Sequence, residues 1–118
     1  MEYPYKNEQF ILNGQYKLLT EENEYRMSHW VKGFGIQDKD GIDIMPISRS
    51  LNLNKLEELD ANRVNVNFEV YPFAFLRFDV VIDLAEKTFI CEEHKMLLSE
   101  LDNFFQQKVD GESAKLGI

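Results

Sequence analysis

Basic residues are scarce in this chain of 118 residues, and that shortage disfavours two kinds of partner. Lysine and arginine together number 13 against 21 aspartates and glutamates, which gives a formal net charge of -8. Nucleic-acid binders need excess positive charge for phosphate contacts, and anionic membrane surfaces attract basic segments. The composition therefore argues against a direct nucleic-acid or membrane partner.

Cysteine and long apolar runs are also lacking. The single cysteine, Cys91, has no partner in the chain for a disulfide, which excludes a secreted disulfide scaffold. The first twelve residues mix charged and apolar side chains, and no stretch approaches about 18 consecutive apolar residues. With neither a signal peptide nor a membrane segment in view, we expect a cytoplasmic location.

Apolar residues are abundant enough for a buried core. They make up 44% of the chain, and 13% of the residues are aromatic, which disfavours disorder. Two domains would each have too little core at this length. We therefore expect one domain over 1–118, with 112–118 forming a loose tail after Asp110-Gly111 ends the last helix.

The first half of the chain contains two candidate hairpins. Asn13-Gly14 lies between apolar runs at 10–12 and 15–19, which is a strong signal for a tight turn. A polar loop is expected over 20–24. Alternation then predicts a strand over 25–32, and the turn residues of 38–41 lead to a second strand over 42–47. Gly33 and Gly35 indicate a bulge or bend, and Pro46 indicates a sheet edge.

The most informative stretch is 63–84, where two alternating runs predict one long hairpin in a single register. Placing Phe68 opposite Phe78 puts the apolar residues of both strands on one face. The same register brings Glu69 opposite Arg77 and Arg63 opposite Asp83. It also pairs Val64 with Ile82, Val66 with Val80, Val70 with Leu76 and Tyr71 with Phe75, around a connection at 72–74.

Two helices are expected. Leu56 and Leu59 fit one helical face, and Asn54 with Glu57 resembles a capping pair, which predicts a short helix over 53–61. After a short return strand at 88–91, the apolar spacing of 97–105 predicts an amphipathic helix packed over 93–108. The sequence thus indicates an α+β fold, with an antiparallel sheet of about five to seven strands and both helices on one of its faces.

Candidate catalytic and metal-binding residues are few. Cys91 and His94 have a Cys-x-x-His spacing, but the chain holds one cysteine and two histidines, too few for a zinc site without distant carboxylates. Glu92 and Glu93 oppose thiolate formation at Cys91. No glycine-rich phosphate loop, nucleophile elbow or zinc-protease helix is present. We therefore predict no enzyme, no cofactor and no metal.

The polar face of the long hairpin is the candidate binding surface. Glu69, Asp79 and Asp83 fall on this face, with Tyr71 near its turn, and Trp30 is a second aromatic anchor if its own strand face is exposed. Charge complementarity speeds the association of an acidic protein with a basic one. The hypothesis is a non-enzymatic protein that docks a basic protein partner, most concretely an immunity-like or antitoxin-like inhibitor of a toxin or nuclease.

Two other hypotheses stay open at this point. One is a small enzyme or ligand-binding domain with a cleft near His29. The other is a homo-oligomeric structural module that pairs through sheet edges or through the face that carries Trp30.

Overall fold

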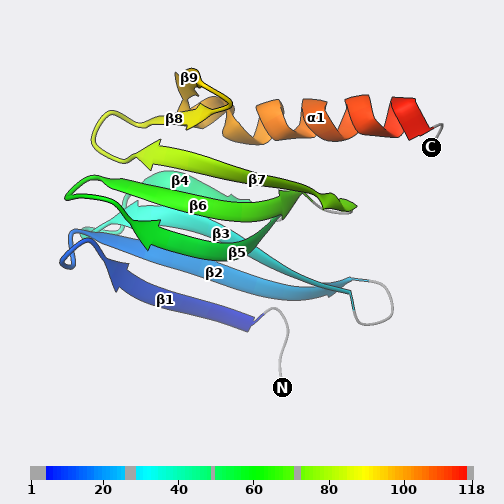
Figure 1. Cartoon of the computed structure of the whole chain (residues 1–118). Coiled ribbons are helices and arrows are strands. Elements are labelled where there is room, and N and C mark those ends of the chain that lie inside the picture. Colours follow the sequence, from blue (N-terminus) through cyan, green and yellow to red (C-terminus); the bar gives the residue numbers. More distant parts are fainter. Residues whose placement is uncertain (1–4, 26–28, 49, 71–72, 117–118) are drawn as a thin grey trace.

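The chain folds into two antiparallel sheets and a C-terminal helix (Figure 1). The structure is a computed structural model; it describes residues 5–25, 29–48, 50–70 and 73–116, and the side chains of 6–23, 31–48, 50–70 and 76–111. The four-stranded sheet consists, in spatial order, of β1 (Tyr5–Ile11), β2 (Tyr16–Tyr25), β3 (His29–Asp38) and β4 (Asp43–Ser48). The five-stranded sheet consists of β5 (Leu51–Glu58), β6 (Arg63–Val70), β7 (Phe73–Asp83), β8 (Thr88–Cys91) and β9 (His94–Leu97).

The first hairpin forms where Asn13-Gly14 predicted it. Ile11 pairs with Tyr16, so the turn holds four residues rather than two, and Leu12, Asn13 and Gly14 have φ of 52°, 57° and 77°. The expected loop over 20–24 was wrong: these residues belong to β2, where 20–22 pair with both β1 and β3, and 23 and 24 pair with β3. A central strand has its backbone groups satisfied by both neighbours, so even an acidic segment stays extended.

The single strand predicted over 25–32 was wrong as well. Tyr25 ends β2 and is the pairing partner of His29, the first residue of β3. The glycine prediction was confirmed, since the register of β3 against β4 shifts on both sides of Ile36. At Gly35 a Cβ atom would lie 2.6 Å from the backbone nitrogen of Ile47, which explains the glycine. Pro46 lies in β4, an edge strand, as expected.

The helix predicted over 53–61 was wrong, because residues 51–58 form β5. Leu51 and Leu53 point into the core, and a bulge between Leu53 and Lys55 shifts the alternation so that Leu56 is the next residue facing inward. This bulge removes the strict alternation that would have indicated a strand. Leu59, predicted to share one helical face with Leu56, follows β5 and is exposed. At the crossing between the sheets, the backbone N–H of Lys32 donates a hydrogen bond of 2.8 Å to Asn52 Oδ1.

The register of the long hairpin was confirmed along most of its length. Phe68 pairs with Phe78, and the charged and apolar partners that the sequence predicted from Arg63 to Glu69 are also found. Next to the turn that connects the two strands the prediction was wrong, because Val70 pairs with Phe73 after a register shift, not with Leu76. Phe73 and the residue after it thus belong to β7, and the expected pair of Tyr71 with Phe75 lies outside the described residues.

The C-terminal segment starts with a strand rather than a helix. β8 was predicted correctly, but the chain then turns at Glu92 and Glu93 into β9, followed by a 3-10 turn, η1 (Leu98–Glu100). The amphipathic helix, α1 (Leu101–Leu116), begins later than expected and continues through Gly111. The prediction that Asp110-Gly111 ends the helix and leaves 112–118 loose was therefore wrong for 112–116.

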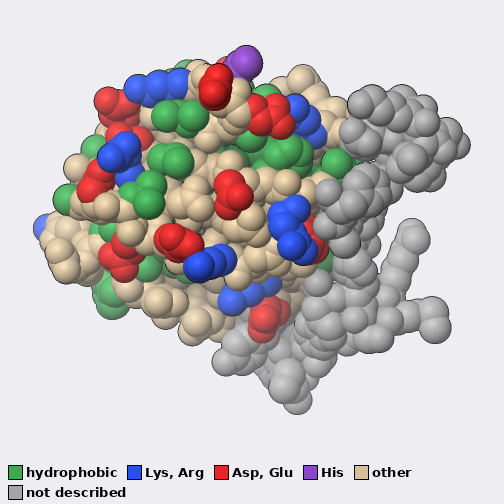
Figure 2. All heavy atoms as spheres, in the orientation of Figure 1, with side chains coloured by type: hydrophobic (Ala, Val, Ile, Leu, Met, Phe, Trp, Pro, Cys, Tyr) green, Lys and Arg blue, Asp and Glu red, His purple; other side chains and the backbone are tan. Residues whose placement is uncertain are grey.

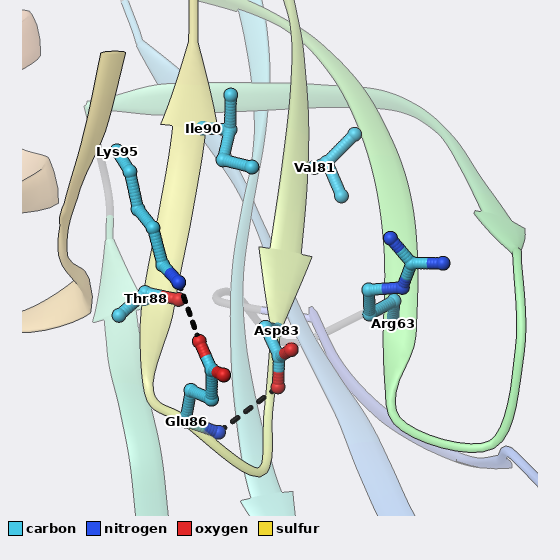
Figure 3. Close-up of a pocket in the computed structure, with 7 residues that line it drawn as sticks. All are labelled: Arg63, Val81, Asp83, Glu86, Thr88, Ile90 and Lys95. Atoms are coloured by element: carbon cyan, nitrogen blue, oxygen red, sulfur yellow. Dashed lines mark hydrogen bonds and ion pairs between the residues drawn. The ribbon is translucent and has the colours of Figure 1, made fainter. Parts of the chain in front are cut away.

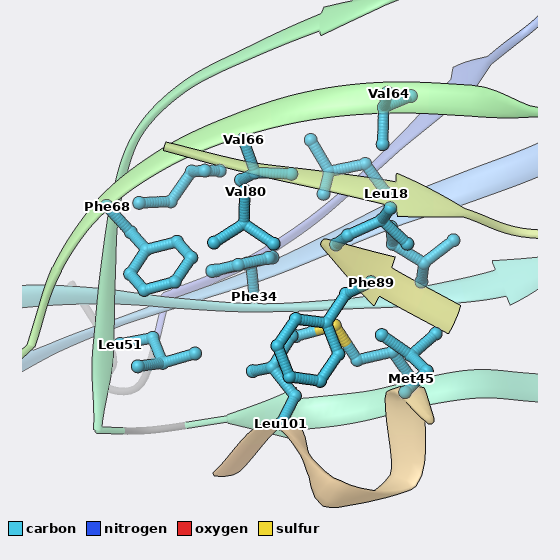
Figure 4. Close-up of a cluster of buried hydrophobic side chains, with 14 of the residues drawn as sticks. Leu18, Phe34, Met45, Leu51, Val64, Val66, Phe68, Val80, Phe89 and Leu101 are labelled. Carbon is cyan, nitrogen blue, oxygen red and sulfur yellow. The ribbon is translucent and has the colours of Figure 1, made fainter. Parts of the chain in front are cut away.

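The core lies between the two sheets, not between one sheet and two helices as expected. Phe34 of β3 meets Phe68 of β6 with 5.9 Å between ring centroids, and Figure 4 shows the side chains of both sheets in one cluster. From α1, Phe105 packs on Phe68 at 4.9 Å and Phe78 at 5.0 Å. Ser48 Oγ donates a 2.6 Å hydrogen bond to Asp102 Oδ1, which ties the start of α1 to β4. Both sheets therefore have one inner and one outer face.

Candidate functional site

Three of the predicted binding residues lie on the outer face of the five-stranded sheet. Because side chains alternate along a strand, the pairs Glu69–Arg77, Asn67–Asp79 and Arg63–Asp83 all fall on the side opposite the buried Phe68. We call this surface the outer face. Its described residues are Asn52, Lys55, Glu57, Arg63, Asn65, Asn67, Glu69, Arg77, Asp79, Val81, Asp83, Thr88, Ile90, Lys95 and Leu97.

The cations of the outer face are all engaged in ion pairs with carboxylates. The pairs are Lys55–Glu57 at 2.6 Å, Arg63–Asp60 at 2.6 Å, Arg77–Glu69 at 2.6 Å and Lys95–Glu86 at 2.7 Å. Figure 2 shows the outcome as blue and red side chains interspersed over this side of the molecule. Such exposed pairs add little stability, but each cancels one positive charge of the face.

Asp79 carries a negative charge that no cation neutralises among the described residues. Its Oδ1 accepts hydrogen bonds from Asn67 Nδ2 at 3.0 Å and Asn65 Nδ2 at 3.4 Å. Asn54 Nδ2 in turn donates to Asn67 Oδ1 at 3.1 Å. A chain of amides thus runs from β5 across β6 to β7 and ends on an exposed carboxylate.

Asp83 stabilises a turn in addition to carrying a charge on the outer face. Its Oδ1 accepts the backbone N–H groups of Ala85 at 3.0 Å and Glu86 at 2.9 Å, which closes the turn between β7 and β8. The pKa of Lys95 is raised mainly by its hydrogen bond to Glu86, and the charge of Asp83 adds to the effect. The pKa of Arg63 is likewise raised, first by its hydrogen bond to Asp60 and in smaller part by Asp83.

A hollow of about 150 Å³ lies on the outer face beside Asp83 (Figure 3). Val81 and Ile90, which pair across β7 and β8, are its apolar residues, while Asp83, Glu86, Arg63 and Lys95 stand around them. Ile90 is 41% exposed, and nearby Leu97 of β9 is 57% exposed. Sequence analysis missed these two residues, although the alternation in 88–91, with Phe89 and Cys91 facing inward, already turned Ile90 outward.

The described residues do not place either predicted aromatic anchor, Trp30 or Tyr71, on the outer face. Trp30 lies in β3 of the four-stranded sheet, where it pairs with Glu24, and its side chain is outside the described set. Tyr71 is outside the described residues altogether. The side chain of His29 is also outside the described set, so the cleft predicted near it falls outside the described side chains.

Cys91 and His94 are cross-strand partners, but their environments differ. Cys91 is buried and His94 is exposed, with its Nδ1 3.4 Å from the carbonyl oxygen of Glu92. Burial raises the pKa of the Cys91 thiol, the charge of Glu92 raises it further, and Lys108 opposes both. A raised pKa favours the protonated thiol over the thiolate, which is the nucleophilic form. Among the described side chains, no three potential metal ligands come together.

Comparison with known proteins adds no assignment. No protein-family model, curated protein or solved structure matches this chain. Within the part of the chain that the structure describes, no helix has the length and apolar character needed to cross a membrane.

Proposed function

We propose that this protein is a non-enzymatic binding protein that docks a basic protein partner on the outer face of the five-stranded sheet. The most concrete form of the proposal is an immunity-like or antitoxin-like inhibitor of a toxin or nuclease. The observation that carries it is the charge arrangement: the outer-face cations are each matched by a carboxylate, whereas Asp79 has only amide partners. A basic partner would meet no unmatched positive charge there.

The hollow beside Asp83 supports a partner with a protruding lysine or arginine. Such a side chain can lay its methylene groups on Val81 and Ile90 while its charged end approaches Asp83. Interfaces combine an apolar centre with a polar, charged rim, and a few anchors that fill pockets carry most of the affinity. The exposed Ile90 and Leu97 supply the apolar centre here.

The net charge of -8 supports fast association with such a partner. Attraction between opposite charges raises the on-rate at low salt, and screening removes it as the Debye length falls from about 10 Å at 0.1 M salt to about 3 Å at 1 M. The off-rate depends more on the apolar contacts, so charge changes at Asp79 and Asp83 should act mainly on the on-rate.

The test is capture of the partner from native lysate with three forms of the protein, followed by mass spectrometry and binding kinetics. The Asp79→Asn/Asp83→Asn variant keeps an oxygen acceptor at each position, so the turn that Asp83 closes is retained. Asp40→Asn/Asp110→Asn removes the same two charges from exposed sites elsewhere. We expect the wild type and the second variant to capture one stoichiometric basic protein, with slower association for the first variant.

Two outcomes would overturn the proposal. A partner whose on-rate ignores both salt and the Asp79/Asp83 substitutions would remove the outer-face mechanism. A turnover assay in which the wild type is active and His29→Ala abolishes the activity would remove the non-enzymatic assignment itself.

A further inference from the structure

β1 differs from the other edge strands of the two sheets. β4 contains Pro46 and pairs irregularly with β3, β5 is bulged and touches β3 through Asn52, and β9 has only four residues. β1 instead pairs with β2 in a continuous register over seven residues and contains no proline or bulge. Prolines, bulges, short length and charged side chains are the usual protection of an edge against pairing with another chain. β1 has no proline, bulge or short length, and its only charged residues are Lys6 and Glu8.

The free edge of β1 is also open to solvent. Residues 6–10 are all exposed, on both faces of the strand, and Phe10 is 63% exposed. On the side away from β2, no strand of the described chain pairs with β1. A regular, exposed edge of this kind presents a row of backbone donors and acceptors to an added strand.

Charge selects the strand that fits this edge. In an antiparallel pair, two directly opposed residues either both point their backbone N–H and C=O groups at the other strand or both point them away. When a strand pairs with its own copy, the twofold axis must therefore pass through a residue, which then lies opposite itself. An axis at Lys6 or at Glu8 places like charges opposite each other. An axis at Asn7 instead places Lys6 of each copy opposite Glu8 of the other, twice by symmetry, and sets Asn7 opposite Asn7.

We propose that β1 is a homodimerisation edge, where a second copy of this chain adds its β1 in antiparallel register about Asn7. The pairing joins two four-stranded sheets into one continuous sheet and places two Lys6–Glu8 pairs across the twofold axis. The outer face of the five-stranded sheet takes no part in this contact, so the dimer proposal and the binding proposal are independent of each other.

The first test measures mass in solution against concentration, by light scattering after gel filtration or by sedimentation. We expect the wild type to move from 13.9 kDa toward twice that mass as concentration rises. Lys6→Glu and Glu8→Lys should each weaken the dimer by about tenfold or more, and the double exchange should restore it. Lys39→Glu, in the exposed turn between β3 and β4, makes the same charge change and should have no effect.

The second test fixes the register. Asn7→Cys places a thiol beside its own copy on the twofold axis, within the Cα separation that a disulfide spans, whereas Gln9→Cys does not. Under mild oxidation, Asn7→Cys should form a covalent dimer much faster than Gln9→Cys, and the buried native Cys91 does not compete. A monomer at every concentration, a dimer indifferent to the charge exchanges, or equal cross-linking of the two variants would overturn the proposal.

Discussion

Phe34 and Phe68 face each other across the interior, one from each sheet, with ring centroids 5.9 Å apart and no exposed surface on either. Phe105 of α1 joins the same cluster, edge-on to Phe68 at 4.9 Å. The sheets and the helix therefore share one core, and the helix is bound to the sheets by its aromatic side chains.

Phe105→Ala should cost about 3–5 kcal/mol of unfolding free energy, because it removes a fully buried ring from between Phe68, Phe78 and Phe89. Phe10→Ala removes the same atoms from a ring that is 63% exposed and should change stability by under about 0.5 kcal/mol. Urea unfolding of both variants gives the comparison. Equal costs for the two would show that α1 is not docked through Phe105.

The same substitution at two glycines should have opposite effects. Gly35→Ala forces a Cβ to within 2.6–2.7 Å of the backbone of β4 and should destabilise the protein by more than about 1 kcal/mol. Gly111 lies exposed in α1 with no atom near the position of a Cβ, so Gly111→Ala should stabilise the protein by about 0.5–1 kcal/mol. Thermal or urea unfolding measures both signs, and a loss of stability in Gly111→Ala would mean that α1 ends before this residue.

The long hairpin could be predicted from the sequence because two independent patterns, apolar and charged, require the same register. Phe68 opposite Phe78 and Glu69 opposite Arg77 each select it alone, and the common face of Glu69, Asp79 and Asp83 follows from the same alternation. The pattern failed where the backbone departs from regular pleating. The bulge after Leu53 shifts the phase of β5, so the alternation that indicates a strand is lost there, and the spacing of Leu56 and Leu59 predicts a helical face instead.

The assembly of two sheets into one core could not be predicted from local patterns. The position of β2 between two strands depends on contacts with β1 and β3, and its acidic segment gives no local sign of them. The placement of Trp30 in a different sheet from Asp79 has the same origin, since it follows from the path of the chain between β4 and β5 rather than from either strand alone.

The turn between β8 and β9 carries two residues in an unfavourable conformation. Glu92 and Glu93 have φ of 52° and 69°, which is the left-handed region that glycine adopts readily and that is strained for other residues. Glu93→Gly should therefore raise the unfolding free energy by about 1 kcal/mol, while the ion pair of Glu92 with Lys108 at 3.1 Å is kept. Glu57→Gly, in β5, relieves no positive φ and should lower stability instead. Chemical unfolding of the two variants tests the difference, and a destabilised Glu93→Gly would contradict it.

The Cys91 thiol should resist alkylation in the folded protein, because burial and then Glu92 raise its pKa above that of a free thiol. Because the pKa is higher in the folded state, stability depends on pH. The contribution of this thiol is complete at pH values below the pKa of the unfolded thiol. Above about pH 8.5 the unfolded chain releases this proton while the folded chain holds it, so this contribution to stability falls as pH rises.

The resistance to alkylation is measured as the rate of reaction with iodoacetamide at pH 8, with and without urea, beside a Cys91→Ala/Ser99→Cys control whose thiol is exposed. We expect the control to react at the same rate in both conditions and Cys91 to react only after unfolding. Rapid alkylation of folded Cys91 would instead indicate an activated thiol and reopen a chemical role for Cys91 and His94.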